Sequence, residues 1–272
     1  IIMLVISFAS CSKQNMSSIT MNETDSLQKL TTFKNTTHQV DIYTKSGKLQ
    51  QGYNKIYFQV KDINQQLVQD ITANWLPMMH MTSMSHSGPH STIQKVANSK
   101  GLYEGYIVFQ MAGNESEYWD LTINYTIDNH DFTVKEKLIV PAFSKRNVVT
   151  FTGTDNQSYI IALVQPQQPK VAVNDIQAMV FKKQDMMNYP VVNGYTIKID
   201  PRMPSMGNHG TPNNIDLTQT QINGIYQGKL SLTMTGYWKI NLQLLNDVGT
   251  LLKGETVNSE TESSSIFFEI EF

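Results

Sequence analysis

The feature that most constrains the fold is an internal repeat. In the first copy, Tyr103-x-Gly105 and Phe109-x-Met111-x-Gly113 come before Trp119, and in the second copy Tyr226-x-Gly228 and Leu232-x-Met234-x-Gly236 come before Trp238. A repeat of this length indicates that one small folding unit occurs twice. The chain has 272 residues, which is about the length of two small domains.

Alternation of apolar and polar residues sets the class of that unit. Along the second copy, Tyr226, Leu230 and Leu232 alternate with polar side chains, as in a strand with one buried and one wet face. About seven such strands per copy, separated by turn residues, predict an all-β protein of two tandem antiparallel β-sandwiches, immunoglobulin-like (cupredoxin-like) in kind. No long helical stretch is expected.

The first ten residues are apolar, too short to span a bilayer, and end in small residues before Cys11, the only cysteine. Phe8-Ala9-Ser10-Cys11 resembles the bacterial lipoprotein signal, although Phe8 departs from the usual aliphatic residue. The resemblance implies cleavage after residue 10, acylation of Cys11, and a lipid-anchored protein on the periplasmic or outer-surface face of the bacterial cell envelope. The alternative is a buried apolar strand with a core cysteine.

Composition divides the rest of the chain. Residues 11–39 are rich in Ser, Thr, Asn and Gln and lack apolar periodicity, which predicts a disordered tether. We expect a first sandwich over residues 40–142 and a second over residues 144–272, with Pro141 near the joint. Each should fold by itself, because each copy carries its own inward-facing apolar residues.

Methionine and histidine cluster in one loop of each copy. The first loop, Trp75 to His90, contains Met78, Met79, His80, Met81, Met84, His86 and His90, and the second, Asp200 to Pro212, contains Met203, Met206 and His209. Met81-x-x-Met84-x-His86 aligns on Met203-x-x-Met206-x-x-His209 with a slip of one residue. Thioether sulfur is a soft ligand that favours Cu(I), and imidazole suits either oxidation state of copper. The loops therefore predict copper as the cofactor.

The two loops differ in their donor sets. With three His and four Met, the first loop should bind copper more tightly and accept Cu(II) as well as Cu(I). Met111 and Met234 lie on inward strand faces and are further candidate ligands. The alternative for all these residues is core packing or an adaptable apolar contact surface, and we interpret Met179, Met186 and Met187 as core or surface residues.

Part of the second copy resembles a known family. Asp200-Pro201-Arg202-Met203-Pro204-Ser205-Met206-Gly207-Asn208-His209-Gly210, followed by Gly224 to Gly228 and Met234 to Trp238, is similar to the YtkA-like/FixH-like domain. The similarity is good from about Gly194 to Leu244 and weaker from Asn74 to Thr122, where the first copy carries an insertion at Asn114 to Tyr118. The resemblance implies an exported or membrane-tethered sandwich linked with copper handling and oxidase assembly.

Charge and motifs narrow the function further. Charged residues make up 16% of the chain and the net charge is −2, so we expect no nucleic-acid partner. Phosphate-binding glycine loops, zinc-protease motifs and nucleophile elbows are missing from the sequence, so no enzymatic activity is predicted. One hypothesis is a lipoprotein that binds copper and passes it to or from another envelope protein. The other is a non-metal interaction module that uses its Met-rich loops as a contact surface.

Overall fold

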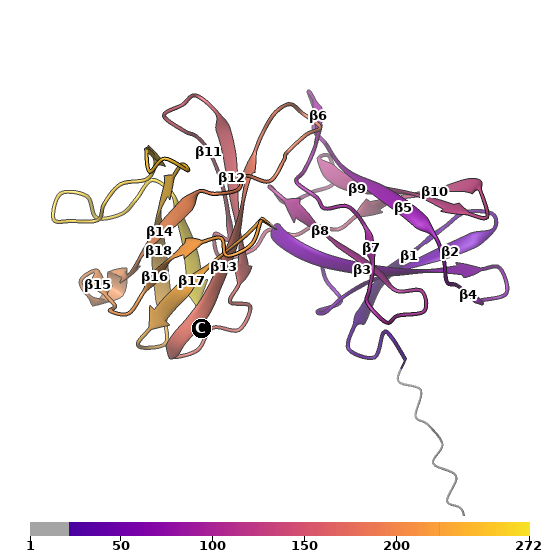
Figure 1. Ribbon diagram of the computed structural model, residues 1–272, viewed down its shortest axis with the longest axis horizontal. Helices are drawn as coiled ribbons and strands as arrows, with labels where there is room; N and C mark the ends of the chain where they lie inside the picture. The colour runs from indigo at the N-terminus through magenta and orange to yellow at the C-terminus, as the bar shows by residue number, and fades with distance from the viewer. Residues whose placement is uncertain (1–21, 223) are drawn as a thin grey trace, which may run out of the picture.

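The structure is a computed structural model that describes residues 22–222 and 224–272 (Figure 1). Its regular elements are antiparallel strands and one short 3-10 turn, which confirms the predicted all-β sandwich class. Cys11 and the signal segment lie outside the described residues. Within the described ranges, no helix has the length and apolar character needed to cross a membrane.

Two sheets form the first half of the molecule. The first sheet has the order β1 (Gln28–Lys34), β2 (His38–Thr44), β3 (Gly52–Asp62), β8 (Tyr103–Phe109) and β7 (Gln94–Lys95), with β4 (Leu67–Val68) paired to β3. The second sheet has the order β10 (His130–Leu138), β9 (Tyr118–Ile127), β5 (Thr72–His80) and β6 (Ser85–Ser87). Their inward side chains, centred on Trp119 and Phe58, form a closed core.

The second half repeats this arrangement. One layer has the order β11 (Val148–Thr152), β12 (Ser158–Gln165), β13 (Ala172–Lys182), β17 (Ile225–Leu232) and β16 (Ile215–Thr218). The facing layer contains β20 (Phe267–Glu271), β18 (Tyr237–Leu245), β14 (Thr196–Met203) and β15 (His209–Gly210), with β19 (Leu251–Lys253) also paired to β18 and the 3-10 turn η1 (Pro204–Met206) after β14. Because β16 pairs with both β17 and β14, the two layers join at that edge.

The repeated tyrosine makes an equivalent hydrogen bond in both halves. The Tyr103 hydroxyl donates to the Gln69 carbonyl at 2.8 Å, and the Tyr226 hydroxyl donates to the Val192 carbonyl at 2.9 Å. Each ties the strand in one sheet to the chain entering the other sheet. Glycine is required at the repeated position Gly105 because the Trp75 ring packs directly against its backbone. A Cβ there would lie 2.5 Å from that ring.

The expected tether is shorter than the sequence indicated. β1 and the start of β2 lie within residues 11–39, and Phe33 is fully buried in the core of the first half. The register between β1 and β2 shifts between Lys29 and Thr31. The apolar side chains of Leu30 and Phe33 are therefore separated by three positions, whereas regular alternation along a strand would separate them by two. A bulge of this kind destroys strict alternation, which is why the sequence pattern concealed the strand.

A third apolar layer joins the two halves. Val108 on the outward face of β8 and Ile160 on the outward face of β12 belong to one buried cluster, and Tyr106 packs against Phe181 with ring centroids 6.2 Å apart. Figure 1 shows β12 on the side of the second half that faces the first. The uninterrupted apolar run from Tyr159 to Val164 is the sequence signal of a strand buried on both faces.

Candidate metal site

The first Met/His segment is a hairpin rather than a loop. β5 and β6 pair so that Met79 faces His86 and His80 faces Ser85, and the Met81 backbone N–H donates to the Met84 carbonyl across the turn at 2.9 Å. Because side chains alternate along a strand, this hairpin divides the predicted ligands between two faces of the sheet. The structure therefore does not bring all seven to one point.

Met79 and His86 occupy the inward face, beside Trp119. Met79 is 1% exposed and pairs with Trp119 across β5 and β9, and the His86 ring meets the Trp119 ring edge-on with centroids 5.7 Å apart. His86 is buried, and its Nδ1–H donates a hydrogen bond to the Ser87 carbonyl at 2.6 Å. This bond favours the tautomer of the neutral ring in which Nε2 carries no hydrogen, and Nε2 makes no hydrogen bond within the described part of the chain, so it is suited to bind a metal.

Met111 and Met81 pack against the same core from the edge. Both are partly buried, and the Trp119 indole N–H donates to the Met111 carbonyl at 2.9 Å. The inward group therefore has one imidazole nitrogen and up to three thioethers. Such a donor set suits Cu(I), whereas zinc sites draw on thiolates, imidazoles and carboxylates.

His80 lies on the opposite face. Its Nε2 is 2.7 Å from Asp120 Oδ2, which also accepts from Lys135 Nζ at 2.9 Å, and its ring stacks on Tyr118. Asp120 Oδ1 is enclosed and without a hydrogen bond among the residues described. Met78 pairs with Asp120 on this same outer face, so these side chains are separated from His86 by the sheet itself.

The remaining members of the first segment are dispersed. Met84 is 47% exposed at the hairpin turn, and His90 Nδ1 is 2.7 Å from the Gly88 carbonyl, with the residue itself bridged to Ile107. No group of three or more His, Cys, Asp or Glu side chains in residues 22–222 and 224–272 is placed to hold a metal. The three imidazoles of the first segment therefore do not converge among the described residues, because the strand pleat turns His80 and His86 to opposite faces.

The second half contains a matching pair. Met203 pairs with His209 across β14 and β15, as Met79 does with His86. Arg202 pairs with Lys239, which places Met203 level with Trp238. The sequence alignment equated Met203 with Met81, whereas the strand register equates it with Met79.

The surroundings of the second pair differ in exposure. Met203 is 3% exposed in the core, Met234 packs against that core, and the Trp238 indole N–H donates to the Met234 carbonyl at 3.0 Å. His209 is exposed, and Met206 in η1 is 56% exposed. Each half therefore has a buried methionine, a tryptophan tied to a second methionine carbonyl, and a histidine across the hairpin.

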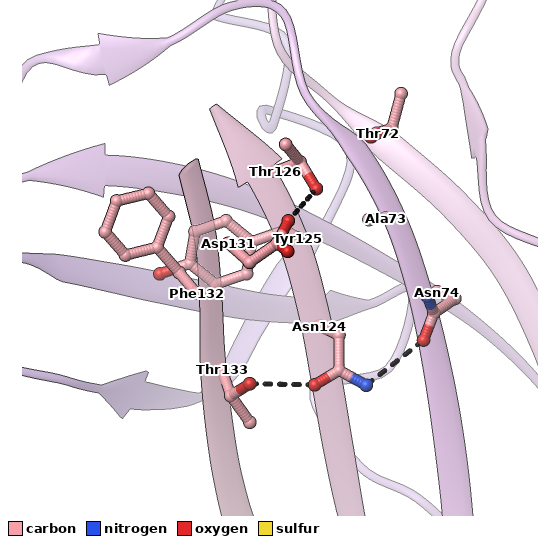
Figure 2. A pocket seen from close by; sticks show the side chains of 9 residues that line it. All are labelled: Thr72, Ala73, Asn74, Asn124, Tyr125, Thr126, Asp131, Phe132 and Thr133. Atoms are coloured by element: carbon pink, nitrogen blue, oxygen red, sulfur yellow. Dashed lines mark hydrogen bonds between the residues drawn. The ribbon is translucent and has the colours of Figure 1, made fainter. Parts of the chain in front are cut away.

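A surface hollow of about 390 Å³ lies elsewhere, on the outer face of β10, β9 and β5 (Figure 2). Its polar groups satisfy one another: Asn124 Nδ2 donates to Asn74 Oδ1 at 3.2 Å, and Thr133 Oγ1 donates to Asn124 Oδ1 at 2.8 Å. Methionine and histidine are missing from its lining. It is thus separate from the Met/His groups.

Two solved structures show weak likeness to the chain. A DUF4785 family protein from Legionella pneumophila subsp. pneumophila str. Philadelphia 1 is 10% identical with a TM-score of 0.26, and the match covers 79% of this chain and 54% of that one, so the chain spans about half the length of that structure. A titin structure is 9% identical with a TM-score of 0.19, covering 72% of this chain and 85% of that one. No curated protein matches the sequence.

A family model gives a more specific result. The matched segment begins at the turn before β12 and ends in β18, and it includes Met203, Met206, His209 and Met234. The expected resemblance of the second copy is therefore supported, and it extends further toward the N-terminus than the sequence motifs indicated. Residues 154–243 match the family described as YtkA-like, and this part of the chain is similar to YtkA-like domains.

Proposed function

We propose that this protein binds copper, with a preference for Cu(I), at one Met/His group in each half. The observation that carries the proposal is the recurrence of one arrangement: a methionine and a histidine paired across a hairpin, beside a tryptophan, in both halves. Core packing alone explains the methionines. It does not explain a histidine opposite the buried methionine in both places.

The donor chemistry fits copper. In the first group, His86 Nε2 and the thioethers of Met79, Met81 and Met111 are the candidate ligands, and in the second they are His209, Met203, Met206 and Met234. Thioethers remain unprotonated and are soft, so they select Cu(I) over zinc or iron. Because only one imidazole faces each group, we now expect both groups to favour Cu(I), which replaces the expectation of a nitrogen-rich first site.

Copper handling or delivery at the bacterial cell envelope is the proposed role. Met84 and Met206 are exposed beside the two groups, where thioethers can exchange a copper ion with a donating or accepting envelope protein. Acylation of Cys11 would hold the protein at the membrane. Membrane fractionation of wild type beside Cys11→Ser tests the anchor, which is wrong if both variants fractionate alike.

The test of copper binding is a Cu(I) titration of the purified full-length chain against a competing chelator. We expect two Cu(I) ions per chain, loss of one in His86→Ala, and loss of the other in His209→Ala. Loss of a direct ligand should lower affinity by more than the roughly 10- to 100-fold that removal of an outer partner costs. His130→Ala is the matched control, because that exposed histidine bonds only to the Asp128 carbonyl among the residues described.

The outcomes separate the two functional hypotheses. Retention of both copper ions in a His86→Ala/His209→Ala double variant would overturn the assigned groups. A wild-type chain that does not compete with the chelator for Cu(I) would favour the interaction module, in which exposed Met84 and Met206 contact a partner instead.

A further inference from the structure

The segment between β13 and β14 belongs to the second half but lies against the hairpin of the first. The Ser87 backbone N–H donates to the Met186 carbonyl at 2.8 Å, and Tyr189 is buried in the same apolar cluster as Val108. Figure 1 shows this segment reaching from the top of β13 to β6. We call residues 183–190 the bridging segment.

The bridging segment is held in a defined turn. The Asp185 carboxylate accepts from the Met187 N–H at 2.6 Å, from the Asn188 N–H at 2.9 Å, and from Asn188 Nδ2 at 2.7 Å. The Gln184 N–H also donates to the Asn188 carbonyl at 3.0 Å. Bonds from the Asn188 side chain and the Met187 backbone lower the pKa of Asp185, as expected of a carboxylate that anchors a turn.

This turn presents two adjacent methionines to solvent. Met186 is 41% exposed and Met187 is 39% exposed, although the segment is closely packed through Tyr189. Ordered, exposed thioethers are an unusual use of methionine, which ordinarily fills gaps in cores. From the sequence, this pair is expected in the core or on the surface. Nothing in the sequence indicates that it lies beside the first half.

Ser87 connects the segment that carries this pair to His86. The Ser87 carbonyl accepts a hydrogen bond from His86 Nδ1, and the Ser87 N–H donates to the Met186 carbonyl, so one residue links the histidine to the methionine turn. Gln110, which precedes Met111, bonds to the Tyr189 hydroxyl from the other side. The bridging segment therefore contacts Ser87 and Gln110, the residues that adjoin His86 and Met111 in the sequence.

We propose that the first copper site is shared between the two halves, with Met186 and Met187 supplying thioether ligands that complete the site opened by His86. The proposal deepens the proposed copper binding and rests on it. His86 offers one nitrogen, and the first-half thioethers of Met79, Met81 and Met111 lie in or against the core, so a copper ion at this site can gain further soft donors from the solvent side. The bridging segment contacts Ser87 through the Met186 carbonyl and carries two exposed thioethers that can provide them. Cu(I) favours such a sulfur-rich shell.

The second site has no such addition. Figure 1 shows β15, which carries His209, at the end of the second half that is farthest from the first half. In the part of the chain that the structure describes, no segment of the first half lies beside β15 (Figure 1). We therefore expect the bridging segment to affect the first site and not the second.

The experiment uses the full-length chain in a His209→Ala background, so that only the first site reports. We expect Met186→Leu/Met187→Leu to weaken Cu(I) binding at least tenfold in competition with a chelator. X-ray absorption at the copper edge should show fewer sulfur neighbours. Leucine keeps a similar volume, so the fold should be retained, and thermal unfolding verifies this. Val171→Leu/Val173→Leu is the matched control, because it changes two exposed side chains to leucine at the opposite end of β13 from the bridging segment.

The possible results distinguish failure of the shared site from failure of the proposed copper binding. Unchanged affinity and sulfur count in Met186→Leu/Met187→Leu, together with loss of binding in His86→Ala, would overturn the shared site and leave the proposed function standing. Binding that survives His86→Ala as well would overturn both. A loss in the methionine double variant that Val171→Leu/Val173→Leu reproduces would also contradict the shared site, since the effect would then not depend on position.

Discussion

At the scale of single residues, the charge on the Asp41 carboxylate is stabilised by three partners. This carboxylate is 2% exposed on β2, and it accepts from Lys29 at 2.5 Å, Lys61 at 2.8 Å and Thr32 at 2.7 Å. Burial by itself would raise the pKa of Asp41, but these three partners outweigh it and lower the pKa to about 2. The charged form is therefore more stable in the folded chain than in the unfolded chain.

The expected consequence is a loss of stability in acid. Because the folded pKa lies below the unfolded value of about 3.9, the contribution is complete above that value and disappears as the pH falls toward 2. We expect roughly 1 to 2 kcal/mol of unfolding free energy to depend on this group. Urea denaturation of wild type and Asp41→Asn between pH 5 and 2 measures it, with exposed Asp247→Asn as the control. Parallel pH profiles for wild type and Asp41→Asn would contradict the assignment.

At the scale of elements, strand alternation decided which candidate ligands meet. His80 and His86 are close in sequence, yet β5 and β6 place His80 on the outer face with Asp120 and His86 on the inner face with Trp119. The sequence identified methionine and histidine as the candidate ligand types. It did not identify their grouping, because the same residues in an irregular loop could converge, whereas in a hairpin they cannot.

β1 provides the element-scale prediction. Phe33 is 0% exposed in the core, so Phe33→Ala should lower the unfolding free energy by about 3 to 5 kcal/mol. Lys34→Ala, at the exposed neighbouring position, is the control and should change little. Chemical denaturation of the full-length chain compares them. Equal stability of the two variants would mean that this segment is a tether after all, as the polar composition first indicated.

At the scale of the whole molecule, the interface between the halves is a third core. Val108 is fully buried there although it lies outside the first sandwich, and burial raises the pKa of Tyr106 to about 12. A fragment beginning at Ser144 would expose Ile160 and Phe181, which the first half covers. We therefore expect the two halves to depend on each other for stability rather than to behave as independent units.

Val108→Asp tests this dependence in the full-length chain. A buried, unpaired carboxylate should weaken the contact by a few kcal/mol and replace a single calorimetric unfolding transition with two. Val173→Asp is the control, because Val173 is 52% exposed on β13. A single unchanged transition in Val108→Asp, with no gain in binding of a hydrophobic dye, would show that the halves are not coupled through this layer.

The sequence by itself determined the class and the repetition of the fold. Alternating strands, the repeated tyrosine and glycine, and the paired tryptophans are local patterns, and each is required by strand geometry wherever it occurs. Only the tertiary structure decided that β1 joins the first sheet, that Met203 corresponds to Met79, and that the Met186 turn lies beside Ser87. These relations depend on a bulge, on the register between strands and on packing between distant segments, which are set by contacts across the fold and leave no periodic signal in the chain.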